Sequence, residues 1–130
     1  AVLQQLRDVG LQQILLAAPT TEPSRMAQLC GSAEGFLYYV SFAGTTGAAH
    51  LSTGDIAARV ADVRARAKAP VAVGFGIRDA ASAKSIAGFA DAVVIGSALV
   101  ERLAGAMDAD DMTARARAFL TPIRAALDAH

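Results

Sequence analysis

The stretch "AVGFGIRDAAS", Ala72 to Ser82, joins the end of an apolar run to the start of a helical pattern through two glycines. The run that leads into it, "PVAV", is apolar on both faces, as expected of a strand inside a parallel sheet. A second stretch, "DAVVIGSALV" at residues 91–100, repeats the arrangement of apolar run, glycine and helical pattern. Two such units in succession are typical of an α/β fold.

The same alternation runs along the whole chain of 130 residues. Apolar runs predict four strands, at Ile14–Ala17, Phe36–Val40, Val71–Val73 and Ala92–Ile95. Helical patterns lie between and after them, at Ser24–Cys30, Asp55–Lys68, Ala80–Ala90, Ala98–Leu103 and Met112–Leu127. No hairpin signal separates the strands, so we expect parallel strands in a sheet that is buried on both sides. Four strand and helix units fit either an open sheet or half of an eight-stranded barrel.

Signals at the helix ends agree with these positions. Asp55 and Asp79 stand where the caps of two helices are expected. The opening segment "AVLQQLRDVG" is interpreted as the end of a helix, with an apolar face and a glycine stop (Leu3, Leu6, Val9 and Gly10). The chain is therefore expected to begin inside a repeating unit. With no linker in the sequence, residues 1–130 are predicted to form a single partial domain.

Composition excludes several classes of partner. Twelve basic and twelve acidic residues cancel without forming a basic stripe, which argues against nucleic acid and membrane surfaces as partners. The longest apolar run, Ala92 to Val100, is interrupted by Gly96 and Ser97 and falls short of the roughly 18 residues of a membrane span. The single cysteine, Cys30, is predicted to be a small buried hydrophobe, which fits a cytoplasmic protein.

The glycines that follow the third and fourth strands predict a phosphate site. Ligands of parallel sheets bind beyond the carboxyl ends of the strands, and a glycine at a helix start lets backbone N–H groups approach an anion. Gly74, Gly76, Gly96 and Ser97 could bind phosphate there without a lysine or arginine. A tight turn explains one such glycine by itself, but two successive strand ends favour the phosphate site.

The long connection after the second strand, "SFAGTTGAAHLST" at residues 41–53, carries glycines on both sides of Thr45 and Thr46. Its length and composition are consistent with a hinged lid or with an ordinary surface loop. His50 lies in it without a suitably placed partner and is expected to be solvated. Tyr38, Phe75 and Leu16 occupy strand positions that either line a cavity or pack in the core. None of the acidic residues is placed as a buried general acid or base.

The segments "LLAAPTT", "FLYYVSFAGTTGA", "PVAVGFGI" and "DAVVIGSALV", in this order and spacing, resemble the second half of the tryptophan synthase alpha chain family. The resemblance covers essentially all of the chain. It implies an α/β fold, namely the C-terminal half of a (β/α)8 TIM barrel with strands 5 to 8. It further implies the cleavage of indole-3-glycerol phosphate to indole and glyceraldehyde 3-phosphate. The indole passes to a beta chain, which carries pyridoxal phosphate, so no cofactor is expected in this chain.

The resemblance also assigns roles to residues. Thr46 matches the lid threonine that supports a catalytic aspartate, and the phosphate-contacting positions are matched by Gly47, Gly76, Gly96 and Ser97. Positions near the indole ring are matched by Tyr38, Phe75 and Leu16. Phe42 stands where the family often has arginine, so a polar tether of the lid is expected to be absent.

The family's catalytic glutamate and aspartate belong to the second strand and the loop after it, which this chain does not contain. We therefore expect no catalytic residue here and no lyase activity from the chain alone. The expected partners are the substrate, the beta chain, and either the missing N-terminal half or further copies of this chain. Two alternatives are a non-catalytic, self-associating half-barrel module and another phosphate-binding TIM-barrel enzyme.

Overall fold

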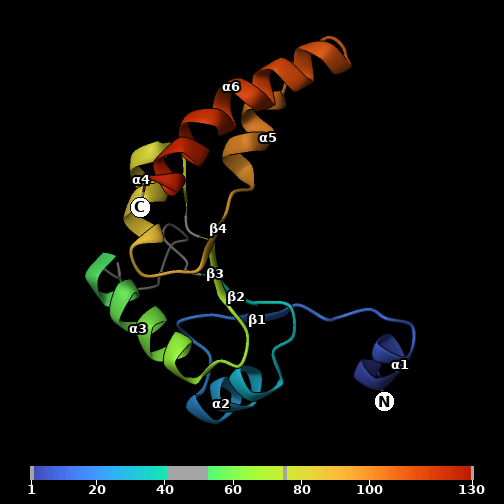
Figure 1. Cartoon of the computed structure of the whole chain (residues 1–130), viewed down its shortest axis with the longest axis vertical. Coiled ribbons are helices and arrows are strands. Elements are labelled where there is room, and N and C mark those ends of the chain that lie inside the picture. The colour runs from blue at the N-terminus through green and yellow to red at the C-terminus, as the bar shows by residue number, and fades with distance from the viewer. Residues whose placement is uncertain (1, 41–52, 75, 130) are drawn as a thin grey trace.

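The computed structural model describes residues 2–40, 53–74 and 76–129. Strands and helices alternate along this part of the chain (Figure 1). The strands are β1 (Leu15–Ala17), β2 (Leu37–Val40), β3 (Val71–Gly74) and β4 (Ala92–Val94). The helices are α1 (Val2–Asp8), α2 (Pro23–Ser32), α3 (Thr53–Arg66), α4 (Ala80–Ala87), α5 (Ser97–Leu103) and α6 (Ala109–Asp128).

The four strands form one sheet in the order β1-β2-β3-β4, and each pairs in parallel with the next. The parallel strands and the crossing helices confirm the α/β fold and its four expected strands. Parallel neighbours that follow one another in sequence require a helix-sized connection, which α2, α3 and α4 are placed to supply.

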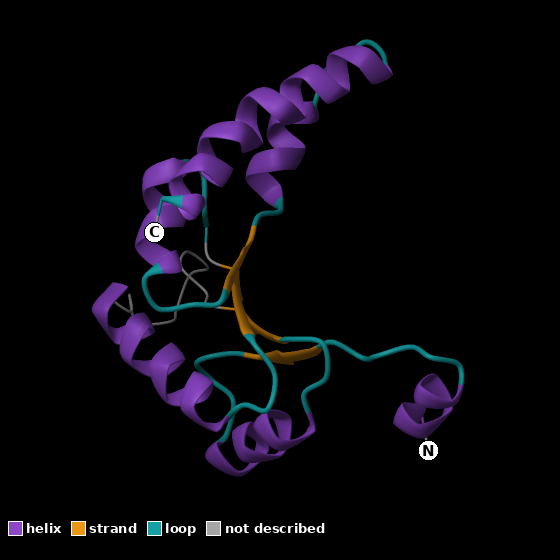
Figure 2. Cartoon of the chain, viewed as in Figure 1, coloured by secondary structure: helices purple, strands orange, loops and turns teal. Residues whose placement is uncertain are grey.

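One face of the sheet holds the core. Leu37, Tyr39, Val71 and Val73 point into it and are at most 1% exposed. They pack against buried side chains from four helices: Met26, Leu29 and Cys30 of α2, Ile56, Val60 and Val63 of α3, Ala83 and Ile86 of α4, and Ile123 of α6. Figure 2 shows α2, α3 and α4 on this side of the strands. Burial of these apolar surfaces is the main stabilising contribution to such a fold.

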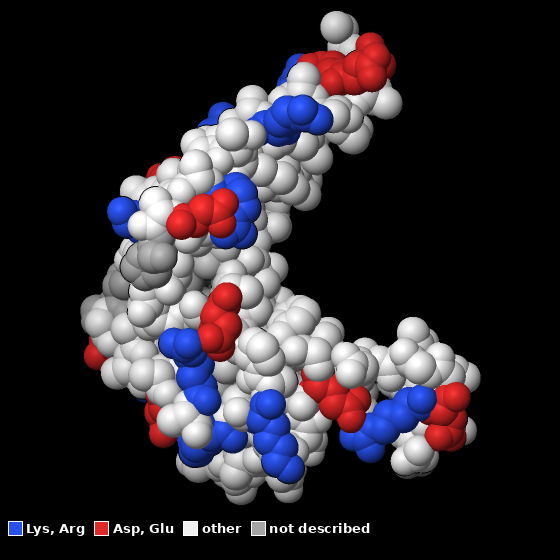
Figure 3. All heavy atoms as spheres, in the orientation of Figure 1, with Lys and Arg blue, Asp and Glu red and all other residues white. Residues whose placement is uncertain are grey.

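The other face of the sheet is open in the part of the chain that is described. Leu16, Tyr38, Ala72 and Ala92 are in register across the four strands. Leu16 is 59% exposed and Ala92 is also exposed, so the expected burial on both sides of the sheet is wrong here. In a closed barrel, side chains from opposite strands fill this space, and four strands supply only one wall of it. A hollow in the molecular surface marks this side (Figure 3).

The helix ends are partly as predicted. Asp79 caps α4: its side chain accepts the N–H of Ser82 at 2.8 Å, and Ser82 in turn completes a capping box. Gly10 follows α1 with φ of +75°, which confirms it as a helix stop. The prediction for Asp55 is wrong, since α3 begins at Thr53 and Asp55 lies in its first turn. A carboxylate there is still favourable to the helix dipole.

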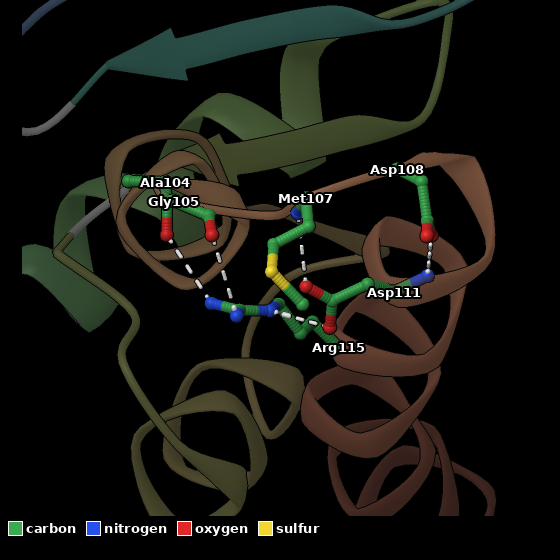
Figure 4. Close-up of polar contacts among 6 residues, drawn as sticks. All are labelled: Ala104, Gly105, Met107, Asp108, Asp111 and Arg115. Atoms are coloured by element: carbon green, nitrogen blue, oxygen red, sulfur yellow. Dashed lines mark hydrogen bonds and ion pairs between the residues drawn. The ribbon is translucent and has the colours of Figure 1, made fainter.

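α6 begins three residues before the predicted start and runs through Pro122. Asp108 caps it by accepting the N–H of Asp111 at 2.8 Å. The corner between α5 and α6 is closed by Arg115, which donates to Asp111 and to the carbonyls of Ala104 and Gly105 (Figure 4). Gly105 has φ of +74°, a conformation that glycine adopts more readily than other residues.

Cys30 is the buried hydrophobe that the sequence predicts. It is 2% exposed, and burial raises the pKa of its thiol, with Arg66 acting in the opposite direction.

Within the described residues, no helix combines the length and hydropathy that crossing a membrane requires.

Candidate binding site at the carboxyl ends of the strands

A cavity of about 360 Å³ lies beyond the carboxyl ends of β2, β3 and β4. It brings together five of the predicted site residues, one from β2, one from the end of β3, one from the turn after β3 and two from the start of α5: Tyr38, Gly74, Gly76, Gly96 and Ser97. Ligands of parallel α/β folds bind at this end of the strands. Residues that the sequence analysis assigned to one site therefore lie around one cavity, at the end of the sheet where a ligand is expected.

Tyr38 depends on Gly74 for its position. A Cβ atom on Gly74 would lie 2.3 Å from the hydroxyl oxygen of Tyr38 and 2.6 Å from a ring carbon. No side chain fits at Gly74 unless the tyrosine ring moves. Gly74, expected to help bind phosphate, lines the cavity and leaves room for Tyr38 above the end of β3.

Part of the cavity lining comes from the turn after β3 and from the start of α5. Gly76 has φ of +41°, in the left-handed region that favours glycine. Gly96 is the N-cap residue of α5, and its carbonyl accepts the N–H groups of Leu99 and Val100. The N–H groups of Ser97 and Ala98 come before these first bonds of the helix and point out of its N-terminal end. Such groups are suited to an anion.

Arg78 and Glu101 also line the cavity, and the sequence analysis assigned neither of them to a site. Arg78 stands two residues after Gly76, within the stretch that predicted the phosphate site. This position is the sequence signal that could have identified it. Arg78 therefore adds a cation to the lining of this cavity, beside the glycines that the sequence analysis named. Glu101 is brought to the cavity by the first turns of α5, which a reading of strand ends alone does not reveal.

Asp79, the carboxylate next to Arg78 in sequence, is committed to the helix cap. Bonds from the backbone and side chain of Ser82 lower the pKa of its carboxyl group. A lowered pKa keeps the group ionised at neutral pH, so it is poorly suited to donate a proton. This agrees with the prediction that Asp79 caps a helix.

Other predicted site residues lie elsewhere. Leu16 is on β1, in register with Tyr38 on the open face of the sheet, and does not line the cavity. Phe42, Thr46, Gly47, His50 and Phe75 fall outside the described residues. In the described part of the chain, no group of three or more His, Cys, Asp or Glu side chains is placed to hold a metal ion.

The sequence of the chain matches a known protein family over nearly its whole length. The family model for "Tryptophan synthase alpha chain" matches residues 1–127. The chain belongs to the tryptophan synthase alpha chain family. It is 57% identical over 120 residues to the tryptophan synthase alpha chain of Xylella fastidiosa strain M12, and 55% identical over 123 residues to that of Xanthomonas campestris pv. campestris strain B100.

Solved structures of tryptophan synthase have the same arrangement of elements. The alpha subunit from Legionella pneumophila strain Paris matches with a TM-score of 0.81 at 34% identity, over 99% of this chain and 47% of that one. An aminoacrylate-bound tryptophan synthase from M. tuberculosis matches with a TM-score of 0.76 at 31% identity, over 97% and 44%. The alignments with the two curated relatives take in 92% and 94% of this chain but 45% of each relative. The chain therefore spans about half the length of the tryptophan synthase alpha chains that it matches.

Proposed function

We propose that this chain forms the phosphate-binding half of a tryptophan synthase alpha subunit. The complete subunit would be a carbon–carbon lyase that cleaves indole-3-glycerol phosphate to indole and glyceraldehyde 3-phosphate in tryptophan biosynthesis. The observation that carries the proposal is the cavity at the ends of β2, β3 and β4, in a chain of this family. Membership of the family makes another phosphate-binding barrel enzyme the weaker alternative.

The phosphate group would be bound by backbone N–H groups near Gly76, Gly96 and Ser97, with Gly47 closing over it from the loop at residues 41–52. The helix dipole of α5 and the charge of Arg78 favour a dianion in this position. Glu101 on the same wall disfavours a second anion, so the cavity would take one phosphate group and no more.

The indole ring would lie against Tyr38, with Phe75 and Leu16 completing an apolar pocket. Leu16 has no role in the isolated half, where it is largely exposed, and would acquire one only when the open face of the sheet is covered. Thr46 would act as a supporting residue of the lid. These assignments place recognition of the substrate in this chain.

The proton transfers of the retro-aldol cleavage would be performed by carboxylates outside this chain. A proton must reach carbon 3 of the indole ring while another leaves the glycerol hydroxyl, and positioned acid and base groups each contribute about 100-fold to 10,000-fold. We therefore propose that the chain by itself has no lyase activity. The partner that receives indole would be a cytoplasmic beta chain, which holds the pyridoxal phosphate, and this chain would need no cofactor.

Titration with inorganic phosphate, followed by the amide resonances of the chain, tests the phosphate site. The signals of Gly76, Gly96 and Ser97 should shift together. Ser97→Asp places a negative charge at the start of α5 and should abolish these shifts. Ser32→Asp, at the exposed end of α2, is the matched control and should bind phosphate like the unmodified chain. Shifts confined to other surfaces, or unchanged binding by Ser97→Asp, would rule out this site.

A further inference from the structure

A second cavity, of about 650 Å³, lies between α4, α5 and α6. Its size is within the range of small-molecule sites. α6 packs against both of the other helices (Figure 1), and Ile123 of α6 is buried in the same core as Ala83 and Ile86 of α4. The edge strands β1 and β4 contribute nothing to the lining. The walls of this cavity are therefore held together by the chain itself, whatever lies beyond the edges of the sheet.

The part of the lining that α6 supplies is mainly apolar. It consists of Ala118, Phe119, Pro122 and Ile123, together with the stem of Arg115. Phe119 is half-buried, and the guanidinium of Arg102 on α5 lies 5.8 Å from the centre of its ring. This cation–π contact positions Arg102 beside the apolar surface. A cavity with such a surface is suited to a ligand that carries a ring.

The charged part of the lining favours an anion. It holds three arginines and one carboxylate, namely Arg78, Arg102, Arg115 and Asp79. The charge of Arg115 is balanced by Asp111, and Asp79 is ionised and occupied in the cap of α4. In the described part of the chain, no carboxylate forms an ion pair with Arg78 or Arg102. Two guanidinium groups and one carboxylate remain, so the lining has one positive charge in excess.

We propose that this cavity binds a small aromatic carboxylate, with its ring against α6 and its carboxylate group bound by Arg78 and Arg102. A guanidinium group binds a carboxylate through two parallel hydrogen bonds, and the single excess charge matches a monoanion. Arg102 already lies over Phe119, so it loses little freedom when the ligand binds. The site does not depend on the lyase function, because the glycines and the serine of the phosphate cavity are not in its lining.

Arg78 connects this site with the phosphate cavity, because it lines both of them. A carboxylate bound to its guanidinium group reduces the positive charge that is available to a phosphate group. By reciprocity, each ligand weakens the binding of the other by the same factor. This coupling, unlike the carboxylate site itself, rests on the proposed function.

Titration with 1-naphthoate, followed by the amide resonances of the chain, tests the carboxylate site. The signals of Arg102, Ala118 and Phe119 should shift together. Arg102→Gln removes a charge and its hydrogen bonds and should weaken the binding of 1-naphthoate by about tenfold or more. Arg117→Gln, at an exposed position of α6 outside this lining, is the matched control and should bind 1-naphthoate like the unmodified chain.

Three results of this titration would overturn the carboxylate site. They are the absence of shifts, unchanged binding by Arg102→Gln, and shifts centred on Gly96 and Ser97, which would mean that 1-naphthoate enters the phosphate cavity. Arg78→Gln is a second, independent variant and should also weaken the binding of 1-naphthoate by about tenfold.

Titration with inorganic phosphate, with and without saturating 1-naphthoate, measures the coupling. The affinity of the unmodified chain for phosphate should fall by about fivefold or more when 1-naphthoate is bound. In Arg78→Gln the affinity for phosphate should not respond to 1-naphthoate. An unmodified chain whose affinity for phosphate does not change would overturn the sharing of Arg78. A chain that binds 1-naphthoate but no phosphate would refute the proposed function and support the carboxylate site.

Discussion

Tyr38 and Gly74 show how one residue positions another at the candidate site. The ring of Tyr38 occupies the space that a side chain at position 74 would need. The ring and hydroxyl of Tyr38 lie at the far end of a side chain that can rotate. A larger residue at position 74 would therefore displace the ring more readily than it would distort the strand. We therefore expect a substitution at position 74 to move the ring out of the cavity while the sheet stays intact.

Gly74→Ala should therefore impair the site more than the fold. We expect a loss of about 1–3 kcal/mol in the free energy of unfolding, as for other overpacked positions. In a Tyr38→Ala background the same substitution should cost much less, because the clashing ring is gone. Urea unfolding of the two single variants and the double variant measures this coupling. Gly31→Ala, in α2 with no atom within 4 Å of its Cβ position, is the control and should be neutral or slightly stabilising. Additive effects of Gly74→Ala and Tyr38→Ala would show that the two residues do not compete for space.

At the scale of elements, Asp91 ties together two strands and a helix. It stands just before β4, accepts the N–H of Val71 at the start of β3 at 2.8 Å, and pairs with Arg64 of α3 at 2.5 Å. Partial burial raises the pKa of its carboxyl group, but the bonds from Val71 and Arg64 outweigh burial and lower the pKa overall. One side chain thus sets the spacing of three elements near the amino ends of the strands.

The lowered pKa of Asp91 gives a stability that depends on pH. The stabilisation is present above the unfolded pKa of about 3.9 and is lost as the pH falls through the lower folded value. Asp91→Asn should cost about 1 kcal/mol at pH 7, and the difference from the unmodified chain should shrink as the pH falls through the folded pKa. Urea unfolding midpoints at several pH values measure the cost of Asp91→Asn and the dependence of that cost on pH. Asp62→Asn removes an exposed pair with Arg66 and should cost less than about 0.5 kcal/mol at any pH. A pH-independent effect of Asp91→Asn would exclude the role of its charge.

The corner between α5 and α6 depends on the backbone of Gly105. Its φ of +74° is unfavourable for residues with a Cβ atom, although there is open space around it. Gly105→Ala should therefore lower the free energy of unfolding by about 1 kcal/mol through backbone strain alone. Urea unfolding tests this against Ala104→Gly, which relaxes the neighbouring residue without requiring a left-handed conformation. A neutral Gly105→Ala would mean that the corner does not hold this conformation in solution.

Elements that depend on residues close together in the sequence were predictable, and features that depend on distant residues were not. The four strands and the cap at Asp79 were predicted because apolar patterns and capping pairs lie within a few residues of each other. The start of α3 was missed because Thr53 carries no stronger local signal than Asp55. At the site, the glycines were found from their positions at strand ends. Arg78 and Glu101 were not, since their approach to the cavity depends on how α4 and α5 leave the sheet. The apolar pattern of β1 predicted burial on both faces, whereas Leu16 is 59% exposed, because the described part of the chain supplies no cover for this face.

The open face determines the behaviour of the whole molecule. Two edge strands without a second neighbour in the described residues and the exposed side chain of Leu16 favour contact with another surface. The tryptophan synthase alpha chains that this chain matches are about twice as long, so the remainder of their length would supply this contact.

A polypeptide that spans the remainder of the family's barrel should therefore form a one-to-one complex with this chain. We expect indole to be released from indole-3-glycerol phosphate only in that complex, because the proposed phosphate site and the catalytic carboxylates then share one barrel. Indole formation and light scattering on the same mixtures measure the two effects together. Ser97→Asp should form the complex and yield little indole. Lyase activity from this chain alone would contradict the division of labour between the halves.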